Sequence, residues 1–550
     1  MEDHDLKEIL SRQTRALEAL GKRFAPQELE KQERRWRVFI TKMVAFSSIM
    51  VSGLFGGWEC FQYLVQQYQI RSMARQYAEV AEAVYYNENN PEVAMEFVGK
   101  SIELDNDNVK YRYLQAYIDG MGAVRRLMNL DRPLNKKEVD QAHKALAQAV
   151  LLKAMSGKRP EPYILQGQIY AALKENDKAF EELQEAVKLD PKNDFAHVRL
   201  AVLLSDEGRT DEALAEIDTA LKLNPKSKWA WLWQGWILAK NKKDLVGARE
   251  AYGKALNLDS RFDMAFYNYA WTFVEQEPAD HDKARENFEK ALAINPDYKE
   301  ALYGLGMVYG TQNQYEIAAL YLDKAIAIDK TFLTAWKWHG IIRAEQERYE
   351  DALTDFSKAI ELAPSQPELY VRRARVYEKT GQIPKAVDDL TYAGELAPED
   401  KRTWLYLGDV FLRVEELDKA LAYYQKAIGL EPAYADAYAQ CSTVYLKQGK
   451  IEEAKSALDK AVEVATYRPC RFLLQRGQLH EECKELEAAA ADYRAAREDE
   501  PKMADAWLAE ANVLERLKQK AAGLEAVSKF IELRPTDKAG QELRAKLEKL

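Results

Sequence analysis

The sequence has 550 residues, too many for one globular core but well suited to a repeat protein, whose core grows with each added copy. The formal net charge is −10 and the lysines and arginines are spread along the chain, so the sequence lacks the basic stripe of a nucleic-acid-binding protein. Four cysteines without metal-ligand spacing argue against a cysteine-based metal site, and they leave the redox compartment undecided.

Residues 1–37 are polar and charged, and apolar side chains recur at spacings of four and three between Leu6 and Phe24. This pattern is typical either of a short coiled coil or of an amphipathic helix that lies on a surface. A homo-oligomer formed through residues 6–24 is the prediction from the first alternative. A surface helix, ending near Pro26, is the prediction from the second.

The stretch Met43–Trp58 contains no charged residue and is mostly apolar. Together with its flanks it gives a segment, 38–65, that is long enough to cross a bilayer as one helix. A buried core helix is the alternative, but the segment precedes the repeats and has little to pack against. A polar lead of this length, without a small-residue cleavage site, is unlike a signal peptide.

Basic residues are unevenly distributed around this segment. Five of them precede or begin it: Lys31, Arg34, Arg35, Arg37 and Lys42. Only Arg71 and Arg75 lie within a comparable distance after it. The asymmetry predicts a single-pass protein with its N-terminus in the cytoplasm and the rest of the chain on the opposite side. In a bacterium, this places the chain in the inner membrane, facing the periplasm; in a eukaryote it faces a lumen.

Residues 66–159 are predicted to form a lead-in helix and two divergent helix pairs. The second pair is interrupted by about twelve extra residues, which are expected to form a loop on one face of the array. This insertion is open to two interpretations, a tolerated loop or a partner contact, and includes Arg125, Arg126, Asp131, Arg132 and Pro133.

Between residues 160 and 535 one pattern recurs eleven times, with a period of 34 to 36 residues. Its spacings of three and four put one apolar face on each of two helices, small residues let the two helices approach closely, and a proline ends the second helix. The clearest copy consists of Trp404, Leu407, Gly408, Phe411, Ala420, Tyr424, Ala427 and Pro432. The copies are expected to begin at residues 160, 194, 228, 263, 299, 333, 367, 401, 435, 470 and 504.

This period and pattern resemble the tetratricopeptide repeat family. The resemblance implies an all-α, right-handed superhelix of about eleven clear and two divergent helix pairs, here preceded by one N-terminal transmembrane helix. The chain is therefore divided into a polar segment, a membrane helix, a divergent region, a regular array and a capping helix: 1–37, 38–65, 66–159, 160–535 and 536–550.

The resemblance also implies that the first helix of each pair lines a concave surface. Positions 2, 5, 6, 9 and 12 of a copy then face the groove, and they are unusually aromatic in this chain. The candidate partner-binding residues are Trp229, Trp233, Trp236, Tyr267, Trp271, Tyr303, Met307, Trp338, Arg372, Arg375 and Tyr406. They would suit an extended or helical peptide with apolar anchors and an acidic group. The alternative is that the rings pack against their own neighbouring helices, as Trp231, Trp336 and Trp404 are expected to do in the core.

Two groove chemistries known in the family are absent from the sequence, the clamp for a C-terminal carboxylate and the asparagine ladder. Phosphate-binding loops, nucleophile elbows and HExxH motifs are absent as well, so no enzyme activity, cofactor or metal is predicted. The predicted function is that of a membrane-anchored scaffold or adaptor for protein or peptide partners. A structural component that packs laterally in a membrane machine, or a regulatory subunit of a membrane enzyme, remains the alternative.

Overall fold

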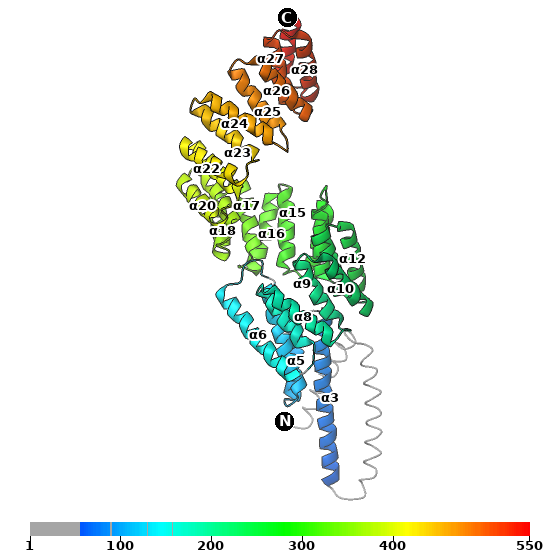
Figure 1. Ribbon diagram of the computed structural model, residues 1–550. Helices are drawn as coiled ribbons and strands as arrows, with labels where there is room; N and C mark the ends of the chain where they lie inside the picture. Colours follow the sequence, from blue (N-terminus) through cyan, green and yellow to red (C-terminus); the bar gives the residue numbers. More distant parts are fainter. Residues whose placement is uncertain (1–55, 89–90, 129, 157) are drawn as a thin grey trace. The chain divides into compact units, whose positions relative to one another are not determined.

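The structure is a computed structural model that describes residues 56–88, 91–128, 130–156 and 158–550 (Figure 1). The predicted polar segment 1–37 and residues 38–55 of the predicted membrane helix lie outside these residues. Among the helices that are described, none is both long enough and apolar enough to cross a membrane. Every regular element in the described ranges is a helix, as the sequence predicts.

The described residues divide into two compact units. The first unit extends to Gln312 and includes Ala327–Phe332. Its helices are α3 (Gly56–Glu88), α4 (Pro91–Leu104), α5 (Val109–Met128), α6 (Lys136–Ser156), α7 (Glu161–Ala172), α8 (Asn176–Leu189), α9 (Asp194–Asp206), α10 (Thr210–Leu223), α11 (Lys228–Ile237), the π-helical turn η1 (Leu238–Lys242), α12 (Leu245–Leu258), α13 (Asp263–Val274), α14 (His281–Ile294) and α15 (Lys299–Thr311).

The second unit comprises Asn313–Ile326 and Leu333–Leu550. Its helices begin with α16 (Tyr315–Ile328), whose last residues belong to the first unit, and continue with α17 (Leu333–Glu345), α18 (Tyr349–Leu362), α19 (Pro367–Lys379), α20 (Ile383–Leu396), α21 (Lys401–Arg413), α22 (Leu417–Leu430), α23 (Ala435–Lys447), α24 (Ile451–Val464), α25 (Cys470–Glu482), α26 (Leu486–Asp499), α27 (Ala504–Arg516), α28 (Lys520–Leu533) and α29 (Lys538–Lys549).

The two helices of a pair approach closely wherever glycine in the first faces a ring in the second. In the pair α21–α22, a Cβ atom added at Gly408 would lie 2.5 Å from Cε1 of Tyr424. The Tyr424 ring is fully buried and its hydroxyl donates a hydrogen bond to Asp409 at 2.8 Å. The small residue in the sequence pattern therefore does what the spacing predicts, since it makes room for a buried ring.

Adjacent copies are joined by a recurring hydrogen bond across the turn between them. The ring at the fourth position of a copy bonds to the backbone carbonyl of the proline six residues earlier. Trp404 Nε1 donates to the Pro398 carbonyl at 2.9 Å, and the same bond joins Trp231 to Pro225, Tyr370 to Pro364 and Trp507 to Pro501. The proline thus ends one helix and also supplies an acceptor for the next copy.

The three tryptophans expected in the core are not equally buried. Trp404 is 4 % exposed, because Tyr423 stacks on its ring and Lys426 covers the other side. Trp231 and Trp336 are only half-buried, although both pack against buried residues of the core. The ring of Trp231 is covered by the flexible side chain of Lys254 rather than by a second ring, which leaves part of it in contact with solvent.

The predicted insertion is mostly helical rather than a long loop. Helices α5 and α6 have 20 and 21 residues, against 13 and 14 in the pair α21–α22. Arg125 and Arg126 consequently lie in the last turn of α5. The short connection that remains is held by Arg132, whose guanidinium makes two hydrogen bonds to Glu138, at 2.8 and 3.0 Å.

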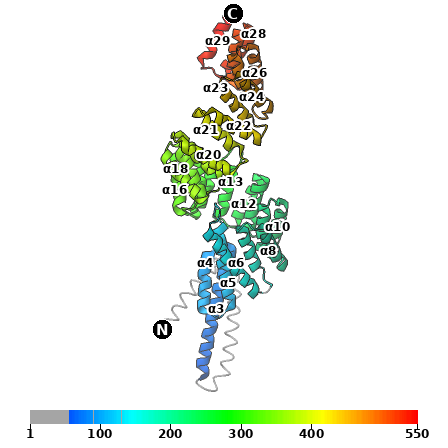
Figure 2. The ribbon, with the colours of Figure 1, turned by 60° about the vertical axis from the view of Figure 1, so that its left-hand side comes forward.

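The last helix, α29, packs against α28 at the C-terminal end of the array (Figure 2). Leu543 and Leu547 are buried there, and Leu547 is in contact distance of the position that a Cβ at Gly523 would occupy. Leu550, which the sequence pattern groups with them, is exposed because it follows the end of the helix.

Candidate partner-binding surface

The aromatic candidate residues of the first unit lie on the first helices of three consecutive copies, α11, α13 and α15. We call Trp229, Trp233, Trp236, Tyr267, Trp271 and Tyr303 the aromatic cluster. At its centre, the ring of Trp271 on α13 lies 6.0 Å from that of Tyr303 on α15 and 6.3 Å from that of Tyr267, between ring centroids. Phe288 of α14 lies 5.7 Å from Trp271 and supports this group from the second helix of the pair.

The three tryptophans of α11 pack differently from one another. Trp233 and Trp236 meet edge to face at 5.3 Å, and the ammonium of Lys240 lies 4.2 Å from the centre of the Trp236 ring. Trp229 meets Phe262 edge to face at 4.7 Å. Each ring is therefore held by a neighbour, so little side-chain freedom is lost when a ligand binds.

Burial separates the aromatic cluster from the core. All six rings of the cluster are half-buried, and each keeps part of its surface accessible to solvent. Met307 is 8 % exposed, so the prediction of a groove-facing position is wrong for this residue. Its flexible, unbranched side chain fills space between helices rather than lining a surface. Both alternatives for the aromatic residues are thus partly realised, because the rings pack on one another and still present apolar area.

The tyrosine hydroxyls in and beside the cluster stay protonated at neutral pH. Burial raises the pKa of Tyr267, and the same cause raises the pKa of Tyr298, whose ring lies 5.2 Å from that of Tyr267. The cluster therefore presents neutral rings and hydroxyl groups, and its chemistry is that of an apolar binding surface with hydrogen-bonding groups at its edges.

Three of the four candidate residues of the second unit, Arg372, Arg375 and Tyr406, are polar and already have partners. Arg372 donates to Glu368 within its own helix, at 2.7 and 2.9 Å. Arg375 is exposed and stacks on the ring of Tyr406 at 5.1 Å. Burial raises the pKa of Tyr406 to about 12, and its hydroxyl donates to Glu378. Trp338 is half-buried. Of the two arginines, Arg375 is the one whose charge is open to solvent.

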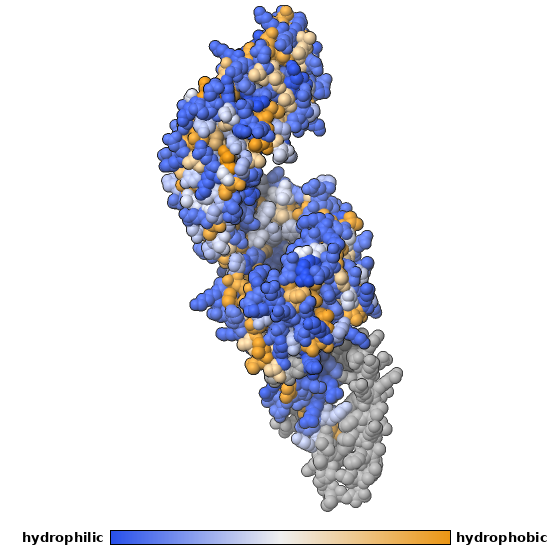
Figure 3. Space-filling view, viewed as in Figure 1, coloured by the Kyte–Doolittle hydropathy of each residue, from blue (hydrophilic) through white to orange (hydrophobic). Residues whose placement is uncertain are grey.

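On the face seen in Figure 3, hydrophilic side chains cover most of the described surface, and the apolar side chains form separate patches.

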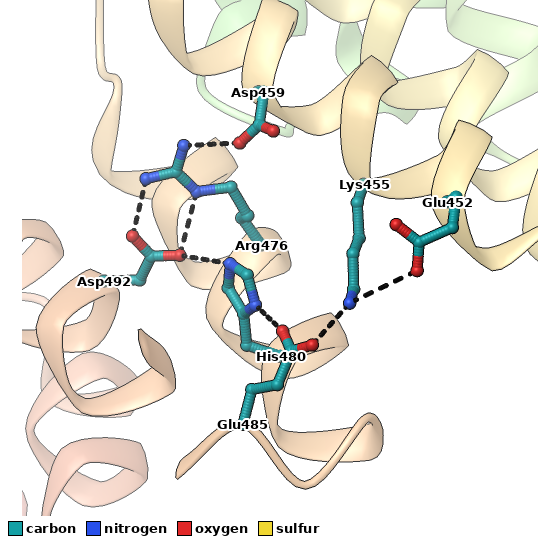
Figure 4. A network of polar contacts seen from close by, with 7 residues as sticks. All are labelled: Glu452, Lys455, Asp459, Arg476, His480, Glu485 and Asp492. Atoms are coloured by element: carbon teal, nitrogen blue, oxygen red, sulfur yellow. Dashed lines mark hydrogen bonds and ion pairs between the residues drawn. The ribbon is translucent and has the colours of Figure 1, made fainter. Parts of the chain in front are cut away.

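A network of charged side chains joins three helices of the second unit (Figure 4). In it, His480 lies between two carboxylates, 2.6 Å from Glu485 and 3.7 Å from Asp492. The network comprises Glu452, Lys455, Asp459, Arg476, His480, Glu485 and Asp492. Each of its four carboxylates contacts Lys455, Arg476 or His480, so the network stabilises the contact between α24, α25 and α26.

Other titratable groups in the described ranges do not form a reaction centre of a recognisable type. No three histidine, cysteine, aspartate or glutamate side chains in that part of the chain come together in an arrangement that could hold a metal ion. Cys470 and Cys483 lie at the start and just beyond the end of α25, and the described cysteines are free thiols.

The sequence pattern did not single out two polar side chains of the first unit. In the described residues, the Nε atom of Arg199 and the Nε2 atom of Gln168 are buried without a hydrogen-bond acceptor. They occupy positions 6 and 9 of their copies, but neither is aromatic.

Comparison with protein families gives matches along most of the regular array. Family models described as "Tetratricopeptide repeat" match residues 170–232, 276–337, 371–437, 411–466, 442–498 and 474–538. A model described as "TPR repeat" matches residues 340–381. One curated relative, the human Protein O-mannosyl-transferase TMTC3, is 26 % identical over 266 residues. This match covers 46 % of the present chain but only 26 % of that protein.

Three solved structures are similar to the chain at low sequence identity. The APC/C hetero-tetramer Cut9-Hcn1 has 16 % identity and a TM-score of 0.41, with 88 % of this chain and 97 % of that chain covered. Yeast Tom70 has 15 % identity and a TM-score of 0.40, with coverages of 80 % and 96 %. YrrB, described as a TPR protein with an unusual peptide-binding site, has 24 % identity and a TM-score of 0.30, with coverages of 36 % and 99 %.

Proposed function

Since the chain belongs to the tetratricopeptide repeat family, we propose that it is a membrane-anchored scaffold that binds protein or peptide partners through the aromatic cluster. Its role is to assemble or localise a membrane-associated complex. It acts by binding alone, without a catalytic site, cofactor or metal.

The observation that carries this proposal is the half-buried state of the six rings. Tryptophan and tyrosine dominate the binding energy of protein interfaces, because each ring buries a large area while losing little conformational freedom. Rings that were fully covered by their own helices would have no area left to offer, and rings held by no neighbour would lose more entropy on binding. The rings of the aromatic cluster keep part of their surface exposed and are also held by neighbouring rings.

Membrane anchoring is proposed from the sequence. Residues 38–65 supply the apolar segment, and the basic residues before it place the N-terminus in the cytoplasm and the repeats on the opposite side. A homo-oligomer through residues 6–24 belongs to the same proposal. A reporter fused after Leu550, combined with protease access in sealed vesicles, tests the orientation; a cytoplasmic C-terminus would refute it.

Partner binding is tested by comparing two variants of the full chain in its native cells. Trp233→Ala with Trp236→Ala removes exposed aromatic area from the cluster, whereas Tyr467→Ala removes a ring that is 78 % exposed in the loop between α24 and α25. Cross-linking and quantitative mass spectrometry are expected to show partners lost from the first variant and retained by the second. Circular dichroism of the purified variants checks that both arrays stay helical.

A structural component that packs laterally is the second candidate, and the mutual contacts of the rings favour it. Trp271, for example, touches Tyr267, Phe288 and Tyr303 and so contributes to the stability of its own unit. Retention of all cross-linked partners by the double tryptophan variant, in a protein that remains folded, would support lateral assembly and refute binding through the cluster.

A further inference from the structure

The helix pair α5–α6 is longer than a regular pair such as α21–α22. Since α5 has 20 residues and α21 has 13, and each begins at the start of its copy, seven additional residues lie at the C-terminal end of α5. At about 1.5 Å of rise per residue, they lengthen the helix by roughly 10 Å. We call residues 125–128 and 130–138, which include the last turn of α5 and the first turn of α6, the tip.

The tip is packed against other elements of the first unit. The side chain of Arg132 is 6 % exposed, and its Nε atom is shielded from solvent. The guanidinium makes two hydrogen bonds to Glu138, and these hold the connection between α5 and α6 in one shape. Leu134 packs against the buried cluster that α3 to α7 form. The tip is therefore not a solvated loop.

The tip lies beside the start of α15, in the fifth copy after its own. Three pairs of side chains interact electrostatically there: Arg125 with Tyr298, Asp131 with Glu300, and Arg132 with Asp329. Lys299 donates a hydrogen bond to Asp329 at 2.5 Å, so the start of α15 and the turn after α16 form one surface. This turn lies within Ala327–Phe332, which belongs to the first unit. Copies of a repeat array ordinarily contact only their neighbours, so an interaction across five copies is a special feature of this unit.

The start of α15 is more covered than the equivalent places in the second unit. Glu300 occupies position 2 of its copy, and its side chain is 29 % exposed. The charged side chains at position 2 of five copies of the second unit are 39 to 80 % exposed: Glu368, Arg402, Asp436, Arg471 and Asp505. Burial raises the pKa of Glu300. A tip that lies over this position accounts for the additional cover.

The surface beside the tip is continuous with the aromatic cluster. The ring of Tyr298 lies 5.2 Å from that of Tyr267, between ring centroids. Phe332, in the same turn as Asp329, lies 6.0 Å from Tyr303 by the same measure. Since Tyr267 and Tyr303 are members of the cluster, the tip reaches the edge of the cluster that α13 and α15 form.

We propose that the tip is a strap, which closes the first unit on itself and covers one edge of the aromatic cluster, so that release of the strap increases partner binding. The proposal rests on the proposed function, since it adds a control over the same binding surface. The strap is held by polar and charged groups at a partly exposed place. Such contacts contribute little free energy each, because water replaces them at small cost, so the strap opens without unfolding the array.

The first test measures hydrogen exchange in three variants of the full-length protein. Arg132→Ala removes the side chain that holds the tip, and it is expected to speed exchange several-fold at the start of α6 and also at the start of α15. Arg125→Ala leaves the pair of Arg132 and Glu138 in place, and it is expected to speed exchange at the start of α15 alone. Arg126→Ala removes an exposed arginine from the same turn of α5 and is expected to change neither region.

The second test measures cover of the cluster by hydroxyl-radical footprinting, which oxidises side chains that are accessible to solvent. Oxidation of Tyr267 and Tyr298 is expected to rise several-fold in Arg132→Ala and to stay at the wild-type value in Arg126→Ala. Tyr467, which is exposed in the second unit, serves as the internal reference for the radical dose.

The third test measures the control of binding with the cross-linked partners that Trp233→Ala combined with Trp236→Ala loses. Their yield, measured by quantitative mass spectrometry in the native cells, is expected to be several-fold higher with Arg132→Ala than with the wild type or with Arg126→Ala.

Three results would overturn the proposal. Unchanged exchange at the start of α15 in both Arg125→Ala and Arg132→Ala would refute closure of the unit by the tip. Faster exchange without increased oxidation of Tyr267 would refute cover of the cluster, and an unchanged yield of partners would refute control of binding. Each of these results leaves the proposed function intact, whereas a double tryptophan variant that retains every partner would refute both.

Discussion

The close approach of Gly408 to Tyr424 makes a quantitative prediction about the pair α21–α22. An alanine methyl group at Gly408 would lie 2.5, 2.7 and 3.0 Å from three atoms of the Tyr424 ring. The ring is buried and its hydroxyl is bonded to Asp409, so it has little freedom to move away. Overpacking of this kind costs about 1–3 kcal/mol, and alanine recovers about 1 kcal/mol through its higher helix propensity. Gly408→Ala is therefore expected to destabilise the pair by up to about 2 kcal/mol.

Gly429→Ala in the same pair is the matched control. Gly429 lies on α22 with no atom near the position of an added Cβ, so only the gain in helix propensity applies, about 1 kcal/mol of stabilisation. A repeat array does not unfold as one two-state system, so the assay is hydrogen exchange of the α21 and α22 amides rather than a single melting temperature. The two variants are expected to differ by about 1–3 kcal/mol, or roughly fivefold or more in exchange rate. Equal protection of these amides in both variants would refute the steric argument.

Two further predictions concern polar contacts between or within copies. His197 meets Glu216 through Nδ1 at 2.5 Å and the Pro191 carbonyl through Nε2 at 3.1 Å, so both ring nitrogens face acceptors, and the Glu216 hydrogen bond raises the pKa of His197. The protonated His197 ring stabilises the pair α9–α10 fully below the ordinary histidine pKa, and this stabilisation is lost as the pH rises through the raised pKa of His197. Hydrogen-exchange protection of the amides of α9 and α10, corrected for intrinsic exchange, should show this loss. His197→Phe should remove the pH dependence. Glu510 is 1 % exposed and accepts hydrogen bonds from Arg494 and Arg497. Glu510→Ala is expected to lower the stability of this part of the array by about 3 kcal/mol and to increase proteolysis near α27. Unchanged cleavage would contradict a stabilising role for Glu510.

The helix pairs could be predicted because their determinants are local in the sequence. A ring, a glycine, a second ring and a proline at fixed spacings specify two helices and their contact, and Gly408 and Tyr424 occupy the expected places. The same locality leaves the degree of burial of each tryptophan unpredicted. A lysine covers both Trp231 and Trp404, but Trp404 also stacks on Tyr423 and is more deeply buried.

The candidate surface could be predicted only in part, because its character depends on contacts between copies. The expectation that positions 2, 5, 6, 9 and 12 of a copy face the groove identified the aromatic cluster. It could not distinguish Met307, which is buried, from the half-buried residues of the cluster. It also gave no reason to notice Arg199, whose buried Nε atom has no acceptor in the described residues, because that depends on what neighbouring helices offer.

The hydrogen bond from the fourth position of a copy to the preceding proline has a mechanical consequence. Tension along the chain can separate adjacent copies at the turn between them. Separating two copies whose turn contains this hydrogen bond costs about 1 kcal/mol more free energy than separating two copies without it. At the copy that begins at residue 299, the fourth position is Leu302, which has no donor for the Pro296 carbonyl. The turns between copies therefore differ in their resistance to force. Force applied along the chain would extend the turn at Pro296–Leu302 more readily than the turn at Pro398–Trp404.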